Sequence, residues 1–159
     1  MYDTQLELIY SNYASEVLDI DYWIVNRQFI CCLNSNEKQF VTIPKGFLTD
    51  GATVPRILWS IFPKWGKYGQ AACVHDFLCE YLIISENGRI RRIERSECDY
   101  FFYTLMTEMG IPKWKRLLMY WGVSLFRVFG KIKDPSVTSK KADIETYLLD
   151  HNEKNNVWL

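Results

Sequence analysis

The spacing of apolar residues changes once along this chain, and the change limits the folds that the chain can adopt. Up to about residue 43 the apolar residues come in short β-prone runs, whereas after residue 66 they recur every three or four positions. Short alternating runs predict strands, and the longer period predicts amphipathic helices. We therefore expect an α+β fold, with an N-terminal antiparallel β-meander followed by about three to four packed helices.

The expected elements follow from this spacing and from the turn residues between the runs. The predicted strands are residues 18–25, 28–33 and 39–43. The predicted helices are residues 56–62, 66–84, 93–109, 113–129 and 142–149. A turn is expected at Glu86-Asn87-Gly88.

The chain has the size and composition of one soluble domain. It has 159 residues, of which 48% are hydrophobic and 24% are charged, close to the values of average globular proteins. We expect a single globular domain over residues 1–130 and a polar C-terminal extension over residues 131–159, with a short helix within it. The longest apolar stretch, residues 117–129, is too short to span a bilayer.

The charge of the chain limits the kinds of partner that it can bind, and its cysteines indicate the redox state of its compartment. The 19 basic and 19 acidic side chains cancel, and although the second half is more basic, we do not expect binding to nucleic acid. The five cysteines include no CxxC pair, and the N-terminus shows no secretory signal. Free thiols in a reducing compartment are therefore expected.

Two segments of the middle third contain the residue types that catalysis and cation binding need. TDGATVPR occupies residues 49–56, and a His75-Asp76 pair lies on the predicted helix 66–84. If a short turn makes helix 93–109 its antiparallel neighbour, Asp99 can accept a hydrogen bond from one ring nitrogen of His75 and leave the other as a base. Asp76 points elsewhere and could bind a hard cation such as calcium with oxygens of the loop. The candidate residues are His75 and Asp99 for catalysis, Thr49, Asp50, Gly51 and Arg56 for binding, and Asp76 for a metal.

Two other interpretations of these residues stay open. The His and Asp side chains could form a polar network that only braces the loop against the helices. A thiol mechanism would use Cys79 as nucleophile and His75 as base, with Asp99 orienting the ring. A zinc site is not expected, because Cys73 and His75 point to different sides of their helix.

The TDGATVPR segment and the HDFL segment about twenty residues later resemble a phage and prophage family of unknown function. The resemblance covers residues 33–130, and it implies a phage or prophage origin without supplying an activity. The matching residues are Gly46, Phe47, Thr49 to Arg56, His75, Asp76, Leu78, Asp99 and Phe102.

A second resemblance, over a shorter motif, is to the helix pair of secreted phospholipase A2 enzymes. Residues 73–77 and 97–102, with Met106, are similar to that pair. The resemblance implies that His75 activates water, Asp76 binds calcium and Asp99 orients His75. This sequence departs from the pattern because it lacks the glycine-rich calcium loop and has Cys79 where those enzymes have Tyr.

Two hypotheses for the function follow. The first is a metal-assisted hydrolase with a phospholipase A2-like His/Asp site, which would use a divalent cation such as calcium and could act on lipid. The second is a noncatalytic phage protein, either a virion component or a factor that binds a host protein. Both hypotheses place the protein in the host cytoplasm, with assembly into a virion as a further destination.

Overall fold

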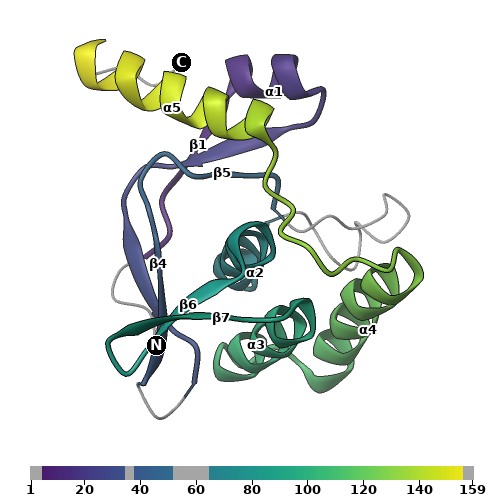
Figure 1. Cartoon of the computed structure of the whole chain (residues 1–159). Helices are drawn as coiled ribbons and strands as arrows, with labels where there is room; N and C mark the ends of the chain where they lie inside the picture. The colour runs from purple at the N-terminus through teal and green to yellow at the C-terminus, as the bar shows by residue number, and fades with distance from the viewer. Residues whose placement is uncertain (1–4, 35–37, 52–64, 156–159) are drawn as a thin grey trace.

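The structure is a computed structural model that describes residues 5–34, 38–51 and 65–155, and in these residues the chain has an α+β fold (Figure 1). The strands are β1 (Leu8–Ser11), β2 (Tyr22–Val25), β3 (Phe29–Cys32), β4 (Gln39–Ile43), β5 (Leu48–Thr49), β6 (Ile83–Glu86) and β7 (Arg89–Arg92). The helices are α1 (Asn12–Leu18), α2 (Gly69–Tyr81), α3 (Arg95–Glu108), α4 (Lys113–Phe129) and α5 (Ser139–Asn155). The predicted class, antiparallel strands ahead of packed helices, is confirmed. The helix expected over residues 56–62 lies outside the described residues.

The strands form two antiparallel sheets in place of one continuous meander. One sheet has the order β1-β2-β5, and the other has the order β3-β4-β6-β7. Strands β2 and β3 follow each other in the sequence but do not pair, because the backbone of Val25 binds a later segment. Its N–H donates to the carbonyl of Phe47 at 2.9 Å, and its carbonyl accepts from the N–H of Gly46 at 2.8 Å. Gly46 has a φ of 89°, a backbone conformation that favours glycine at this close approach.

Helix α1 occupies a segment for which the sequence predicted only the start of a strand. Ser11 caps the helix, since its Oγ accepts a hydrogen bond from the N–H of Ala14 at 3.1 Å. The helix ends at Asp19, which has a left-handed φ of 59°. The predicted strand over residues 18–25 is therefore limited to β2.

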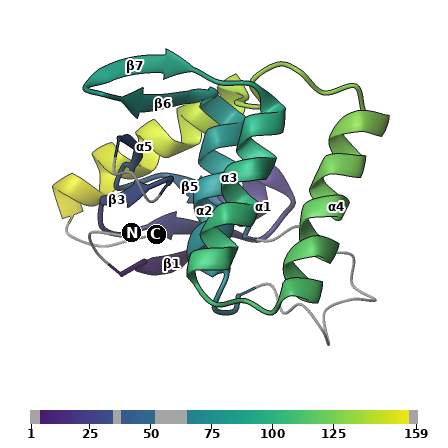
Figure 2. The ribbon, with the colours of Figure 1, turned by 90° about the horizontal axis from the view of Figure 1, so that it is seen from below.

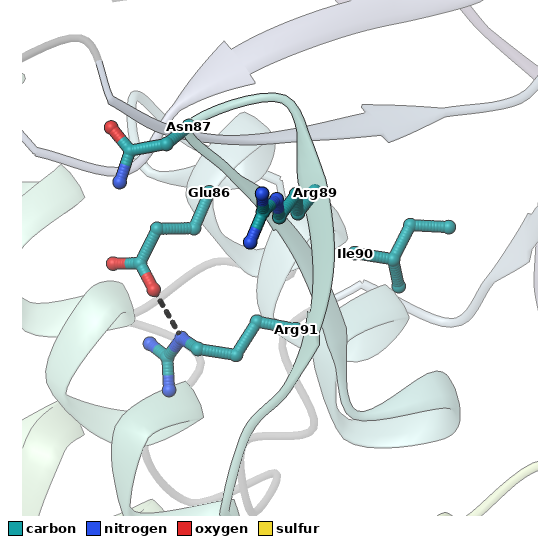
Figure 3. A pocket seen from close by; sticks show the side chains of 5 residues that line it. All are labelled: Glu86, Asn87, Arg89, Ile90 and Arg91. Atoms are coloured by element: carbon teal, nitrogen blue, oxygen red, sulfur yellow. Dashed lines mark ion pairs between the residues drawn. The ribbon is translucent and has the colours of Figure 1, made fainter.

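A β-hairpin separates α2 from α3, where the sequence predicted only a turn. Leu82 ends α2 in a left-handed conformation, so the helix is shorter than predicted and β6 begins directly after it. Asn87 and Gly88 both have positive φ values, 51° and 75°, which suits a tight hairpin turn. In Figure 3, Arg91 of β7 turns back to Glu86 of β6, with 2.8 Å between Nε and Oε2.

Helix α2 lies at the centre of the molecule. The β-strands lie on one side of it and α3 on the other, with α4 outermost beyond α3 (Figures 1 and 2). Most of its side chains are buried, including Ala71, Ala72, Val74 and Leu78. Small residues at 71 and 72 allow close approach of neighbouring elements, which explains why one helix can be enclosed on several sides.

Helix α5 closes one end of the structure and is longer than the short helix expected around residues 142–149. It lies beside α1 (Figure 1), and Ile144 and Leu148 are buried in a small apolar cluster with Ala14, Ile24 and Leu48. Apolar burial and polar contacts together hold this C-terminal helix on the strands, on α1 and on α2. The polar contacts are Leu48 N–H to Glu145 at 2.8 Å and the ion pair of Lys141 with Glu80.

None of the helices in the described ranges has the length and apolar character that crossing a bilayer requires.

The packing of α5 predicts that shortening one of its buried side chains lowers the stability of the protein. Leu148 is fully buried, so Leu148→Ala should lower the free energy of unfolding by about 2–5 kcal/mol through lost burial and a residual cavity. Urea denaturation followed by circular dichroism measures this change. Asp150→Ala, an exposed position on the same helix, is the matched control and should have little effect. Equal stability of Leu148→Ala and wild type would mean that α5 does not pack on the core in solution.

Candidate active site

His75 on α2 and Asp99 on α3 meet across the helix interface. Nε2 of His75 lies 3.0 Å from Oδ1 of Asp99, a normal hydrogen-bond distance. The two helices pack against each other although the β6–β7 hairpin, and not a short turn, connects them. The hydrogen bond fixes the orientation of the imidazole ring, and the ring of Phe102 supports it at a centroid distance of 4.8 Å.

Asp99 is nearly buried, with its carboxylate held by three partners. In addition to His75, Oδ2 accepts hydrogen bonds from Nε of Arg127 at 2.7 Å and from Oγ of Ser124 at 3.3 Å. Burial by itself would raise the pKa of Asp99, but the hydrogen bonds from His75 and Arg127 outweigh this effect and lower it. Asp99 is therefore an anion in the folded protein at neutral pH.

Cys79 is the third group at the ring of His75. Its Sγ lies 3.5 Å from Nε2, the same nitrogen that contacts Asp99. The hydrogen bond from Cys98 and the neighbouring His75 lower the pKa of Cys79. Burial by itself would lower the pKa of His75, but the negative charge of Cys79 and the hydrogen bonds with Asp99 and Cys79 raise it to about 10.

The start of the TDGATVPR segment is attached to Asp76. Oγ1 of Thr49 donates to Oδ2 of Asp76 at 2.6 Å and accepts from the N–H of Gly51 at 3.1 Å. Gly51 has a φ of 75°, and a Cβ there would come within 2.9 Å of the Trp65 ring, so the position requires glycine. Burial and the repulsion of Asp50 raise the pKa of Asp76 well above its ordinary range.

Two carboxylates of the described residues lie where the sequence predicted a cation. Asp50 and Asp76 are close enough to repel each other, and carboxylate oxygens are ligands that calcium prefers. In residues 5–34, 38–51 and 65–155, however, no three His, Cys, Asp or Glu side chains are grouped as a metal site requires. Calcium takes six to eight oxygen ligands, so two carboxylates would supply only some of them and other donors would have to supply the rest. Arg56, another predicted binding residue, lies outside the described residues.

The site opens into a pocket of about 950 Å³ between α2, α3, α4 and the segment after α4. Asp50, His75, Asp76, Cys79 and Asp99 all line this pocket. Its opposite wall is mostly apolar. The apolar side chains in that wall are Leu118, Met119, Trp121, Val123, Leu125, Phe126 and Ile132, whereas Phe102 lines the pocket beside His75. The structure thus brings the described candidate residues to one accessible cavity, except Thr49, which is buried and binds Asp76 from behind. Carboxylates lie at one side of the cavity and a wide apolar surface at the other.

Two residues of the site, Ser124 and Arg127, were not among the sequence candidates. Both lie on α4, and both bind the carboxylate of Asp99. Arg127 interrupts the longest apolar stretch of the chain, and a charge in such a stretch needs a partner if it faces the interior. That interruption was the available signal, but the sequence does not say which carboxylate is the partner.

A comparison with family models assigns the chain to a family. Residues 23–123 match the family described as "Protein of unknown function (DUF1353)", and the chain therefore belongs to this family. The chain is also 34% identical over 86 residues to "Uncharacterized protein y4jT" of Sinorhizobium fredii (strain NBRC 101917 / NGR234). That match covers 53% of this chain and 23% of the relative, so the chain spans about a quarter of the relative's length. No solved structure matches the chain.

The environment of His75 predicts how stability depends on pH. Its pKa is raised from 6.5 to about 10, so folding favours the protonated ring. The resulting stabilisation is fully present below about pH 6.5 and is lost as the pH rises through about 10. Up to about pH 9, the ordinary pKa of a thiol, this loss is offset by the lowered pKa of Cys79. Between about pH 9 and 10 the free energy of unfolding should fall more steeply for wild type than for His75→Gln, as measured by urea denaturation across the pH series.

The other histidine of the chain provides the control. His151→Gln removes an imidazole from α5 and should keep the pH dependence of wild type. If the wild-type profile were as flat as that of His75→Gln, the interactions assigned to His75 would not stabilise the folded state.

Proposed function

We propose that this protein is a hydrolase of carboxylic esters with an apolar acyl chain, in which His75 acts as a general base and Asp99 orients it. One observation carries the proposal: the hydrogen-bonded His75–Asp99 pair lines an open pocket of about 950 Å³ and is not sealed in the core. A purely structural network would not require access from solvent. Neither the family description nor the name of the relative states an activity, so the support for hydrolysis comes from this geometry.

The hydrogen bond to Asp99 sets the tautomer that the mechanism needs. With its proton on Nε2 and donated to Asp99, the neutral ring has its lone pair on Nδ1. Nδ1 would take a proton from a water molecule as the water oxygen attacks the ester carbonyl carbon. The same proton would then pass to the leaving alkoxide oxygen when the carbon–oxygen bond breaks. The anionic Asp99, held by Arg127 and Ser124, stabilises the imidazolium in between.

Water is a better candidate for the nucleophile than Cys79. A thiol nucleophile and an orienting carboxylate normally contact opposite nitrogens of the histidine ring. Here Cys79 and Asp99 both contact Nε2, and the contact with Asp99 is the shorter one. Cys79 is therefore assigned to the wall of the pocket.

The lining of the pocket supports an apolar substrate. Phe102 from α3 and Trp121 and Leu125 from α4 contribute large apolar surfaces within reach of the same cavity as His75. Burial of a hydrocarbon chain against such surfaces provides binding free energy in proportion to the area removed from water.

A divalent cation such as calcium is proposed at Asp50 and Asp76, where it would offset the repulsion between the two carboxylates.

Removal of the base tests the proposal directly. His75→Ala should lower kcat/KM for nitrophenyl esters of medium-length fatty acids by about 10²–10⁴-fold, because general-base assistance is lost. Release of nitrophenol measures the rate, with and without added calcium. Cys79→Ala should keep the activity and reach it at lower pH, because the thiolate is a main cause of the raised pKa of His75. Wild-type protein without turnover would refute the proposed function, and loss of activity in Cys79→Ala with little change in His75→Ala would assign the reaction to the thiol.

The pH–rate profile separates the two chemistries further. A base must be unprotonated, so kcat/KM should rise with pH towards about 10, the pKa of His75. Asp99→Asn removes a hydrogen bond that raises this pKa, and the inflection should move to lower pH. A thiolate mechanism would instead reach full activity at neutral pH. An inflection that Asp99→Asn leaves unchanged would mean that His75 is not the titrating base.

A noncatalytic role is the second candidate, and the buried state of Asp99 favours it. Its carboxylate is enclosed by partners on α2 and α4, as in a network that fixes helix packing. In this case the protein would bind a phage virion component or a host protein. His75→Ala should then lower the melting temperature, and neither wild type nor the variant should hydrolyse esters. A folded, stable His75→Ala variant that has lost its phage function would contradict this role.

The biological setting is part of the same proposal. The resemblance of the TDGATVPR and HDFL segments to phage and prophage proteins supports a phage or prophage origin. We expect the protein to act in the host cytoplasm, with or without assembly into a virion.

A further inference from the structure

Helix α4 exposes an apolar stripe along its whole length. The stripe residues recur at intervals of three and four positions, which places them on one face of the helix. They are Trp114, Leu118, Trp121, Leu125, Val128 and Phe129, all of them exposed. Trp121 is 57% exposed and Phe129 is 81% exposed. Single exposed apolar residues are normal on soluble proteins, but a continuous stripe marks an interaction surface.

The opposite face of α4 accounts for its attachment to the rest of the protein. Met119 is buried there, and Val123 packs against the main core. Arg127 and Ser124 bind Asp99 on the same side. Because these contacts hold the helix in place, the stripe is not needed for folding. In both views α4 is the outermost helix on the side away from the sheets (Figures 1 and 2).

The charged side chains of α4 itself and of the three residues after Gly130 are all basic, with exposed Glu108 and Asp134 just outside this stretch. Residues 109–133 contain no Asp or Glu. Lys113 and Lys115 lie in the first turn of α4, and Lys131 and Lys133 follow its last turn. Lys113, Lys131 and Lys133 are exposed. Basic side chains at both ends of an apolar and tryptophan-containing face are the pattern of helices that lie in the interface of an anionic bilayer.

We propose that α4 docks this protein on the surface of a membrane that contains anionic lipids. The apolar stripe enters the boundary between headgroups and acyl chains, and the lysines at the two ends contact headgroup phosphates. The helix lies flat on the surface, since it is too short and too polar on its inner face to cross the bilayer. Trp121 and Leu125 belong both to the stripe and to the wall of the pocket, so the pocket would open close to the lipid. This inference depends on α4 alone and stands whether or not His75 catalyses hydrolysis.

Vesicle binding tests the inference with the full chain. We expect the protein to sediment with phosphatidylcholine vesicles that contain phosphatidylglycerol, and to bind vesicles of phosphatidylcholine alone at least about tenfold more weakly. Tryptophan fluorescence should shift to shorter wavelength on binding, because Trp114 and Trp121 would leave water. High salt should weaken the binding, since the attraction between lysines and phosphates is screened.

Each test variant on α4 has a control variant on the β6–β7 hairpin with the same change of charge at an exposed position. Phe129→Glu puts a charge into the stripe and should weaken binding at least tenfold, whereas Ile90→Glu, at a position 80% exposed on the β6–β7 hairpin, should not (Figure 3). Lys131→Glu with Lys133→Glu should also weaken binding at least tenfold, whereas Arg89→Glu with Arg92→Glu should have a smaller effect. Circular dichroism checks that each variant keeps the fold, and the lysine pair provides a second test if Phe129→Glu does not fold.

Three results would overturn the proposal. The first is equal binding of wild type to anionic and neutral vesicles, or no binding to either. The second is an equal loss in the stripe variant and in Ile90→Glu. The third is a wild-type dimer in light scattering that Phe129→Glu converts to a monomer without any vesicle binding, which would assign the stripe to a second copy of this chain.

Discussion

The carboxylate of Asp99 is the contact on which the helical half of this protein depends. A buried anion is costly unless partners replace the water that it loses, and Asp99 obtains them from two neighbouring helices. His75 of α2 binds one oxygen, and Arg127 and Ser124 of α4 bind the other. One side chain of α3 thereby sets the positions of α2 and α4, and it holds the only histidine of the pocket wall in a defined orientation.

The pocket and the exposed face of α4 are both consequences of this attachment. Helix α4 contacts the core through one side, with Met119 buried and Arg127 paired, while the side that carries Trp121 and Leu125 remains accessible. The gap between α4 and α2 becomes a cavity with His75 at one wall. A site for chemistry and a surface for docking thus arise from the same helix, with Ser124 and Arg127 on its inner side.

The other end of the molecule depends on a second buried polar contact. Glu80 near the end of α2 pairs with Lys141 of α5, and burial raises the pKa of Glu80 to about 7 despite this pairing. Lys141 also lies over the ring of Phe47, at 4.5 Å from the centroid. These contacts connect the C-terminal helix to the segment that leads into Thr49 and Asp50. Helix α2 therefore links both polar contacts, which explains why so much of it is buried.

The local pattern of the sequence determined the class of fold and the three central helices. The period of apolar residues located α2, α3 and α4, because each has an apolar face that repeats every three or four residues. Pro112 and Gly130 gave the bounds of α4 to the residue, whereas the bounds of α2 and α3 were right to within a few positions. The apolar period also placed His75 and Asp99 on successive helices, but the short turn expected to make these helices neighbours is a hairpin in the structure. Local pattern failed at β6 and β7, since Ile83 and Ile84 continue the apolar run of α2 and only a left-handed Leu82 separates them from it. The tertiary structure alone decided the division into two sheets, because strand pairing depends on backbone partners far apart in sequence, as with Val25 and Phe47. It likewise decided that Arg127 and Ser124 complete the surroundings of Asp99, because a buried charge selects its partners by position in space.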